Sequence, residues 1–209
     1  MAHPKIRAFP NYKKQKIMIT TIRMMMGLLL CTALQTALPA QSKFFTRSGQ
    51  ITFDAEGITD YFEEIKALNK EAVCVLDFQS GKMEWAVRMK GFHFKNGLME
   101  EHFNENYVES EQYPKAVFKG DLTGLPDEAA LQKTGSWPVT AKGLLTLHGV
   151  THQVSSTGSI QSDGEGLHAV AAFSVKLEDY KIKIPSIVGS KIAEVVDITV
   201  DANLQPLKK

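Results

Sequence analysis

The sequence has 209 residues, of which 44% are hydrophobic and 22% charged, which is ordinary globular composition and a length that fits one domain. Its formal charge is +1, but the first forty residues hold six basic and no acidic residues, which leaves 18 basic and 23 acidic residues and a charge of −5. Because a mildly acidic chain lacks the positive surface that attracts nucleic acid or anionic membranes, we expect neither as a partner.

The first forty residues have the pattern of a secretory signal peptide. Their basic residues include Lys13, Lys14, Lys16 and Arg23. An apolar stretch follows over residues 24–34, and small residues at 37–40 precede a polar segment. This stretch is shorter than the about 20 residues that span a bilayer, which favours a signal peptide over a retained anchor. Residues 1–17 are either a mis-assigned start or a long basic flank, and we expect a periplasmic or secreted protein whose domain covers 41–209.

Cys74 is the only cysteine beyond this segment. The expected domain therefore cannot form an internal disulfide or a cysteine zinc site, and it is long enough to bury a core without either. Because Cys74 lies in the strand-like run 72–76, we interpret it as a small buried hydrophobic side chain.

Apolar residues alternate with polar ones along most of the chain after residue 70, which predicts strands with one buried face. The apolar rows are Met83, Trp85, Val87 and Met89; Ala116, Phe118 and Leu122, with Gly120; Val139, Ala141, Gly143, Leu145 and Leu147; Ala169, Ala171, Phe173, Val175 and Leu177; and Val196, Ile198, Val200 and Ala202. Turn signals at 80–82, 148–149 and 162–166 separate these rows. Strands at intervals of about 10 to 15 residues with little helix between them predict a sandwich or barrel.

One segment departs from this alternation. From Asn96 to about Ser110, apolar side chains recur at Met99, Phe103 and Tyr107, which is the spacing of a short amphipathic helix or helical loop. Asn96 is a suitable N-terminal cap. A further helical turn is expected within residues 125–134.

No arrangement of residues predicts catalysis, a cofactor or a metal. The histidines beyond the first forty residues are scattered, at His93, His102, His148, His152 and His168. Glu100, Glu101, His102 and Glu105 are close enough in sequence to form a metal site, but the solvated face of an amphipathic helix is the favoured interpretation. We expect no catalytic residues, no metal ligands and no cofactor, and we keep a metal-dependent enzyme that uses His102 as a hypothesis.

Two blocks of sequence resemble the signatures of the YceI-like family of lipid-binding proteins. Residues 143–151 read Gly-Leu-Leu-Thr-Leu-His-Gly-Val-Thr. Upstream of them, residues 99–103 read Met-Glu-Glu-His-Phe and residues 113–118 read Tyr-Pro-Lys-Ala-Val-Phe. The order and spacing of these blocks also fit the family, and the resemblance extends from about Phe44 to Leu207.

The resemblance implies an all-β fold, a lipocalin-like, extended antiparallel barrel of about eight strands with one short helix or helical loop near 96–110. It implies an exported protein that carries or scavenges an isoprenoid-type lipid, either a polyisoprenoid or an isoprenoid quinone, inside the barrel. The expected lining residues are Trp85, Val87, Met89, Phe118, Leu145, Leu147, Phe173 and Val175, and those expected to close the mouth are Phe103, Tyr107 and Tyr113.

Other functions remain open at this stage. A barrel filled by its own side chains would act through its surface on another envelope protein. Small residues in the inward rows, at Ala141, Gly143 and Ala171, favour a hollow interior instead. Stable membrane insertion is not expected, because the outward faces carry charges such as Glu84 and Arg88. A homodimer is left open.

Overall fold

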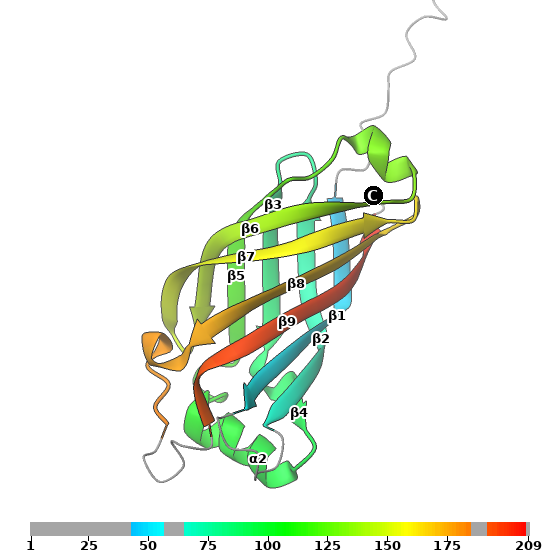
Figure 1. Ribbon diagram of the computed structural model, residues 1–209. Helices are drawn as coiled ribbons and strands as arrows, with labels where there is room; N and C mark the ends of the chain where they lie inside the picture. The colour runs from blue at the N-terminus through cyan, green and yellow to red at the C-terminus, as the bar shows by residue number, and fades with distance from the viewer. Residues whose placement is uncertain (1–42, 57–64, 185–191, 208–209) are drawn as a thin grey trace, which may run out of the picture. The chain divides into compact units, whose positions relative to one another are not determined.

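The computed structural model describes residues 43–56, 65–184 and 192–207, which form an antiparallel β structure (Figure 1). The expected signal peptide lies outside the described residues. The strands are β1 (Lys43–Glu56), β2 (Lys66–Asp77), β3 (Lys82–Arg88), β4 (Phe92–Phe94), β5 (Lys115–Thr123), β6 (Gly135–Leu147), β7 (Val150–Ser162), β8 (Leu167–Lys176) and β9 (Ile192–Pro206). The helical segments are η2 (Met89–Gly91), α2 (Gly97–His102), η3 (Phe103–Tyr107), η4 (Glu128–Gln132) and η5 (Leu177–Tyr180).

The sheet closes on itself. Its order is β1-β9-β8-β7-β6-β5-β3-β2, and β2 pairs again with β1, which completes an eight-stranded barrel. The short β4 pairs with the first part of β2, beside β3. An eight-stranded barrel is just wide enough to be filled by side chains or to hold one small ligand, so its interior decides what the fold can do. The all-β barrel expected from the sequence is confirmed.

The β2–β3 hairpin follows the predicted turn but contains an interruption. Gly81 has φ +72° at the turn, as the sequence pattern required. Strand β3 ends at Arg88, whereas the alternation predicted a strand through Met89. The buried Asn69 of β2 explains the difference, because its amide donates to the Arg88 carbonyl (2.8 Å) and its side-chain oxygen accepts from the Glu71 N–H (2.8 Å). This side chain takes the place of backbone pairing where β3 turns through η2 into β4.

The expected helical segment is confirmed as α2 followed directly by a π-helical turn, η3. Asn96 caps α2 by accepting a hydrogen bond from the Leu98 N–H (2.9 Å). Glu100 attaches the helix to the barrel, because one of its oxygens accepts from the Phe94 N–H (3.1 Å). None of the described helices is long and apolar enough to cross a membrane.

The ladder between β7 and β8 is shorter than the strands themselves. It joins residues 157–162 to 167–172, and beyond the Thr157–Ala172 pair no strand pairing connects β7 and β8 within the described chain. Side chains replace it there: the Ser156 hydroxyl donates to the Ala172 carbonyl (3.0 Å), and His152 Nε2 lies 2.8 Å from the Asp179 carbonyl oxygen in η5. One side of the barrel wall is therefore held by side chains rather than by a β-ladder.

Candidate functional site

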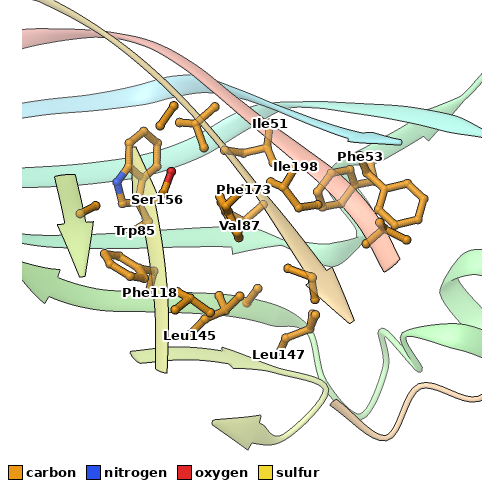
Figure 2. A pocket seen from close by; sticks show the side chains of 18 of the residues that line it. Ile51, Phe53, Trp85, Val87, Phe118, Leu145, Leu147, Ser156, Phe173 and Ile198 are labelled. Carbon is orange, nitrogen blue, oxygen red and sulfur yellow. The ribbon is translucent and has the colours of Figure 1, made fainter. Parts of the chain in front are cut away.

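The barrel encloses a cavity of about 370 Å³ (Figure 2). Among the described residues that line it there is no Asp, Glu, Lys or Arg, and nearly all are aliphatic or aromatic. The labelled side chains in Figure 2 carry a nitrogen only at Trp85 and an oxygen only at Ser156. Such a wall binds a ligand by removing apolar surface from water, which is worth roughly 25 cal/mol per Å².

Period-two alternation explains how the strands build this wall. Every second residue of a strand faces inward, so each predicted apolar row contributes to one strip of the lining. Of the residues expected to line the cavity or close its mouth, the structure places ten in the lining: Trp85, Val87, Met89, Phe103, Tyr107, Phe118, Leu145, Leu147, Phe173 and Val175. Their contact with a ligand stays a prediction.

Tyr113 differs from that expectation, since it does not line the cavity. Its ring packs instead against His148 at the β6–β7 turn, with ring centroids 4.5 Å apart. Tyr113 precedes Pro114, which disfavours helical backbone at this residue, and β5 begins directly afterwards at Lys115.

Strands β1 and β7 supply lining residues that the sequence analysis missed. Ile51 and Phe53 of β1 face the cavity. They alternate with polar residues in the segment 50–54, so the same alternation could have predicted an inward-facing strand there. Strand β7 contributes Val154 and Ser156. Its inward row is too rich in Ser and Gly to read as apolar, and only its pairing with β6 reveals it.

An aromatic cluster lies where the α2–η3 segment meets the barrel. The Phe103 ring packs against Phe53, Phe92 and Phe94 at centroid distances of 5.6, 5.6 and 5.1 Å. All four side chains line the cavity, so η3 contributes to the cavity wall through Phe103. Edge-to-face and tilted aromatic pairs of this kind contribute about 0.5–1.5 kcal/mol each beyond the area they bury.

The small residues of the inward rows have two different roles. Ala141 and Ala171 line open space in the cavity. Gly120 and Gly143 face each other across β5 and β6, and a Cβ at either position would lie 2.7–2.8 Å from the tip of the Phe118 ring. A Cβ on Gly143 would also lie 2.3 Å from the Lys119 carbonyl oxygen, so this glycine allows the close approach of β5 and the Phe118 ring and does not by itself hollow the barrel.

Cys74 is buried in the cavity wall, 1% exposed, as interpreted from the sequence. Burial raises the pKa of its thiol to about 12 because the thiolate would lose its hydration. The neutral thiol is a poor nucleophile at physiological pH, so Cys74 acts as a wall residue.

The side chains of the hypothetical metal site turn to separate partners. Glu100 contacts His93 Nδ1 (3.2 Å), whereas His102 Nδ1 lies 2.9 Å from the Asn106 amide nitrogen. In the part of the chain that the structure describes, no group of three or more His, Cys, Asp or Glu side chains is arranged to hold a metal ion. This geometry gives the enzyme hypothesis no support.

His148 and Gly149 form the β6–β7 turn with φ values of +51° and +70°, the pattern of a type I′ hairpin turn. His148 Nε2 lies 2.8 Å from a Glu109 carboxylate oxygen, and Nδ1 lies 3.0 Å from the Tyr180 carbonyl oxygen. Because Tyr113 packs on the same turn, the two signature blocks of the sequence are in contact. We call the contacts among Glu109, Tyr113, His148, Gly149 and Tyr180 the clasp.

The fold and the cavity together define an all-β barrel with an apolar interior. The chain matches the YceI-like domain over residues 34–204, and it belongs to the YceI-like family. The comparison with curated proteins gives no match.

Solved structures share this fold at low sequence identity. A polyisoprenoid binding domain from Saccharophagus degradans, implicated in plant cell wall breakdown, superposes with a TM-score of 0.66 at 13% identity, over 79% of this chain and 99% of that one. Burkholderia cenocepacia BcnA gives a TM-score of 0.60 at 12% identity, over 75% and 95%. The Campylobacter jejuni YCEI protein gives 0.52 at 18% identity, over 72% and 90%. At these identities the likeness shows the fold alone.

Proposed function

We propose that this protein binds an isoprenoid-type lipid, a polyisoprenoid or an isoprenoid quinone, inside its barrel and acts as a carrier or scavenger rather than as an enzyme. The observation that carries the proposal is the cavity, whose described lining includes no charged carboxylate or ammonium group. Burial of an isoprenoid chain in such a wall is worth about 0.8 kcal/mol per CH₂ group, so affinity needs few polar contacts.

Two further observations support this proposal. Family membership places the chain with YceI-like proteins, and one structural neighbour is described as a polyisoprenoid binding domain. The N-terminal pattern of basic flank, apolar stretch and small residues supports export to the periplasm or beyond, where a carrier would move lipid between membranes.

The test is native mass spectrometry of the protein purified from its own source, followed by organic extraction of bound molecules. A co-purifying apolar molecule of isoprenoid mass is the expected result. A clean ligand-free mass, even after incubation with quinones and polyprenols, would contradict the proposal and favour a barrel that acts through its surface.

Two neighbouring alanines of β8 provide a matched pair of variants. Ala171 lines the cavity, whereas Ala172 is exposed on the outer face of the same strand. Ala171→Phe places a ring in the ligand space and should reduce the bound fraction at least about tenfold, while Ala172→Phe adds the same ring outside and should leave it unchanged. Equal ligand content in both variants would place the ligand elsewhere.

A further inference from the structure

The wall of the barrel has a seam between β7 and β8 that no β-ladder closes. The two strands pair from Ser162–Leu167 to Thr157–Ala172, and beyond that pair they separate while each strand continues (Figure 1). We call the facing segments, 150–156 of β7 and 173–180 of β8 and η5, the seam. Among the described residues no backbone hydrogen bond joins these two segments, so the seam can open without breaking a ladder.

The seam borders the cavity directly. Val154 and Ser156 line the cavity from the β7 side of the seam, and Phe173 and Val175 line it from the β8 side. The seam therefore crosses the cavity wall, and separation of its two sides would open the apolar interior to the outside.

A few side chains of β7 and of the β6–β7 turn hold the seam closed. At the end of the ladder the Ser156 hydroxyl donates to a β8 carbonyl. His152 Nε2 lies 2.8 Å from the Asp179 carbonyl oxygen of η5, and His148 of the clasp contacts the next carbonyl, that of Tyr180. Segments held by so few contacts open at a lower free energy than strands joined by a backbone ladder.

The closed position of η5 leaves one buried polar group unsatisfied. Tyr180 is 2% exposed and packs on the His152 ring, with ring centroids 5.2 Å apart. Its buried hydroxyl has no hydrogen-bond partner within the described chain, which costs free energy that hydration would recover. Directly after η5, Lys181 has φ +59°, a left-handed conformation that is unfavourable for a residue other than glycine. Both features reduce the free-energy difference between a closed and an open seam.

The two ends of the barrel are held by buried contacts instead. At the end that carries α2, the Phe103 ring packs against three other phenylalanines (Figure 1). At the opposite end, where β6 begins, the Ser162 hydroxyl donates to the Leu131 carbonyl of η4 (2.7 Å), and both residues are buried. The seam, whose His152 is exposed, is therefore an easier place to open than either of these contacts.

We infer that the seam is a lateral gate through which an apolar ligand enters and leaves the barrel, and that His152 holds this gate closed. The inference rests on the proposed function and goes beyond it, because it concerns the route of the ligand rather than its identity. Opening separates η5 from the β6–β7 hairpin while the paired part of the β7–β8 ladder stays closed. A long apolar chain then enters sideways through the wall.

The first experiment bridges the seam covalently. Continuing the register of the ladder by two residues places Ser155 opposite Ser174, and both side chains are exposed. A variant with Ser155→Cys and Ser174→Cys, in a Cys31→Ser background, is treated with a bis-maleimide that contains a reducible disulfide. The control combines Ser155→Cys with Lys142→Cys, which is the exposed partner of Ser155 in the β6–β7 ladder. Cys74 is buried with a raised pKa, so its thiol should not react.

Uptake and release of the neutral fluorescent probe N-phenyl-1-naphthylamine are followed by stopped-flow fluorescence. Bridging the seam should slow both entry and exit at least about tenfold and leave Kd within about threefold, because a gate changes the barrier and not the bound state. Cleavage of the bridge with a reductant should restore both rates. The bridge between β6 and β7 should leave both rates unchanged, since these strands are already joined by a full ladder.

His152→Ala tests the closing contact without a bridge. It removes the contact with the Asp179 carbonyl and should raise the entry and exit rates about 3- to 10-fold with little change in Kd. His168→Ala is the control, because His168 contacts Asp201 where β8 and β9 are fully paired, and it should change neither rate.

The outcomes separate the gate from the proposed function. Probe uptake at the same rate with the seam bridged and unbridged, or equal slowing by the two bridges, would overturn the inference and leave a carrier that loads by another route. Rates unchanged by His152→Ala would overturn the role of His152. Failure of the unbridged protein to take up the probe at all would overturn the proposed function, and the gate with it.

Discussion

Gly149 of the β6–β7 turn occupies a position where the backbone conformation and a neighbouring ring leave no room for a side chain. Gly149 has φ +70°, and a Cβ there would lie 2.6 Å from Cε1 of the Tyr113 ring. Both the left-handed backbone and the short contact oppose any other residue. The conformation and the contact therefore explain why this position of the signature is a glycine.

Gly149→Ala should consequently lower the free energy of unfolding by about 1–3 kcal/mol. Chemical denaturation followed by circular dichroism measures this change. Gly97→Ala is the control, because Gly97 has open space around its Cα at the start of α2 and should be neutral or slightly stabilising. Equal effects of the two substitutions would show that the turn geometry carries no special cost.

Cys74 predicts a pH dependence of stability at the alkaline end. Its pKa is raised from the model-compound value of 9.0 to about 12 by burial, so the folded protein holds the thiol proton more tightly than the unfolded chain does. The resulting stabilisation is fully present below pH 9 and is lost as the pH rises toward 12.

Chemical denaturation at pH 8 and pH 10 tests whether stability falls as the pH rises. The measurement uses a Cys31→Ser variant, in which Cys74 is the remaining cysteine. Between pH 8 and pH 10, the free energy of unfolding of the Cys31→Ser variant should fall by about 1 kcal/mol more than that of the double variant that also carries Cys74→Ala. An identical pH dependence with and without Cys74 would refute the prediction.

Among the structural elements, the clasp joins the β6–β7 hairpin to two segments at one end of the barrel. The His148 side chain is 10% exposed, and both its ring nitrogens lie against oxygen acceptors, on Glu109 and on Tyr180. His148 therefore connects three separate parts of the chain through one side chain.

His148→Asn keeps a residue that tolerates positive φ but removes these contacts. We expect a loss of about 1–3 kcal/mol and a melting temperature lower by roughly 3–10 °C. His168→Asn is the control, since His168 contacts Asp201 on an exposed surface and should cost at most about 0.5 kcal/mol. A melting temperature unchanged by His148→Asn would show that the clasp does not stabilise the barrel.

For the whole molecule, a ligand that binds only the folded barrel must raise its stability. At a free concentration of about 100 times Kd the gain is about 2.7 kcal/mol, which corresponds to a rise of roughly 5–10 °C in melting temperature. Differential scanning fluorimetry with decylbenzoquinone should show this rise for the wild type and for Ala172→Phe. Ala171→Phe should show little or none, and a full rise in that variant would argue against the cavity as the binding place.

The alternation of inward and outward residues predicted strands with one buried face in a sandwich or barrel, and the resemblance to the YceI-like family implied the barrel. Trp85, Phe118 and Phe173 were identified from parity, and the structure places each in the cavity wall. Ser156 was not identified, because only its register with Ala141 of β6 shows that it faces inward. Tyr113 was expected to close the mouth of the cavity but packs on His148 instead. The direction of a loop side chain depends on tertiary contacts, which the alternation of apolar and polar residues does not predict.

The type I′ turn of the clasp has a consequence for how relatives of this protein are compared. Its glycine, its histidine and the tyrosine that covers it do not line the cavity, so their contacts join hairpin, loop and helix without forming any of its wall. Any preference among ligands would depend instead on the inward side chains of the strands, which are the positions to compare between relatives.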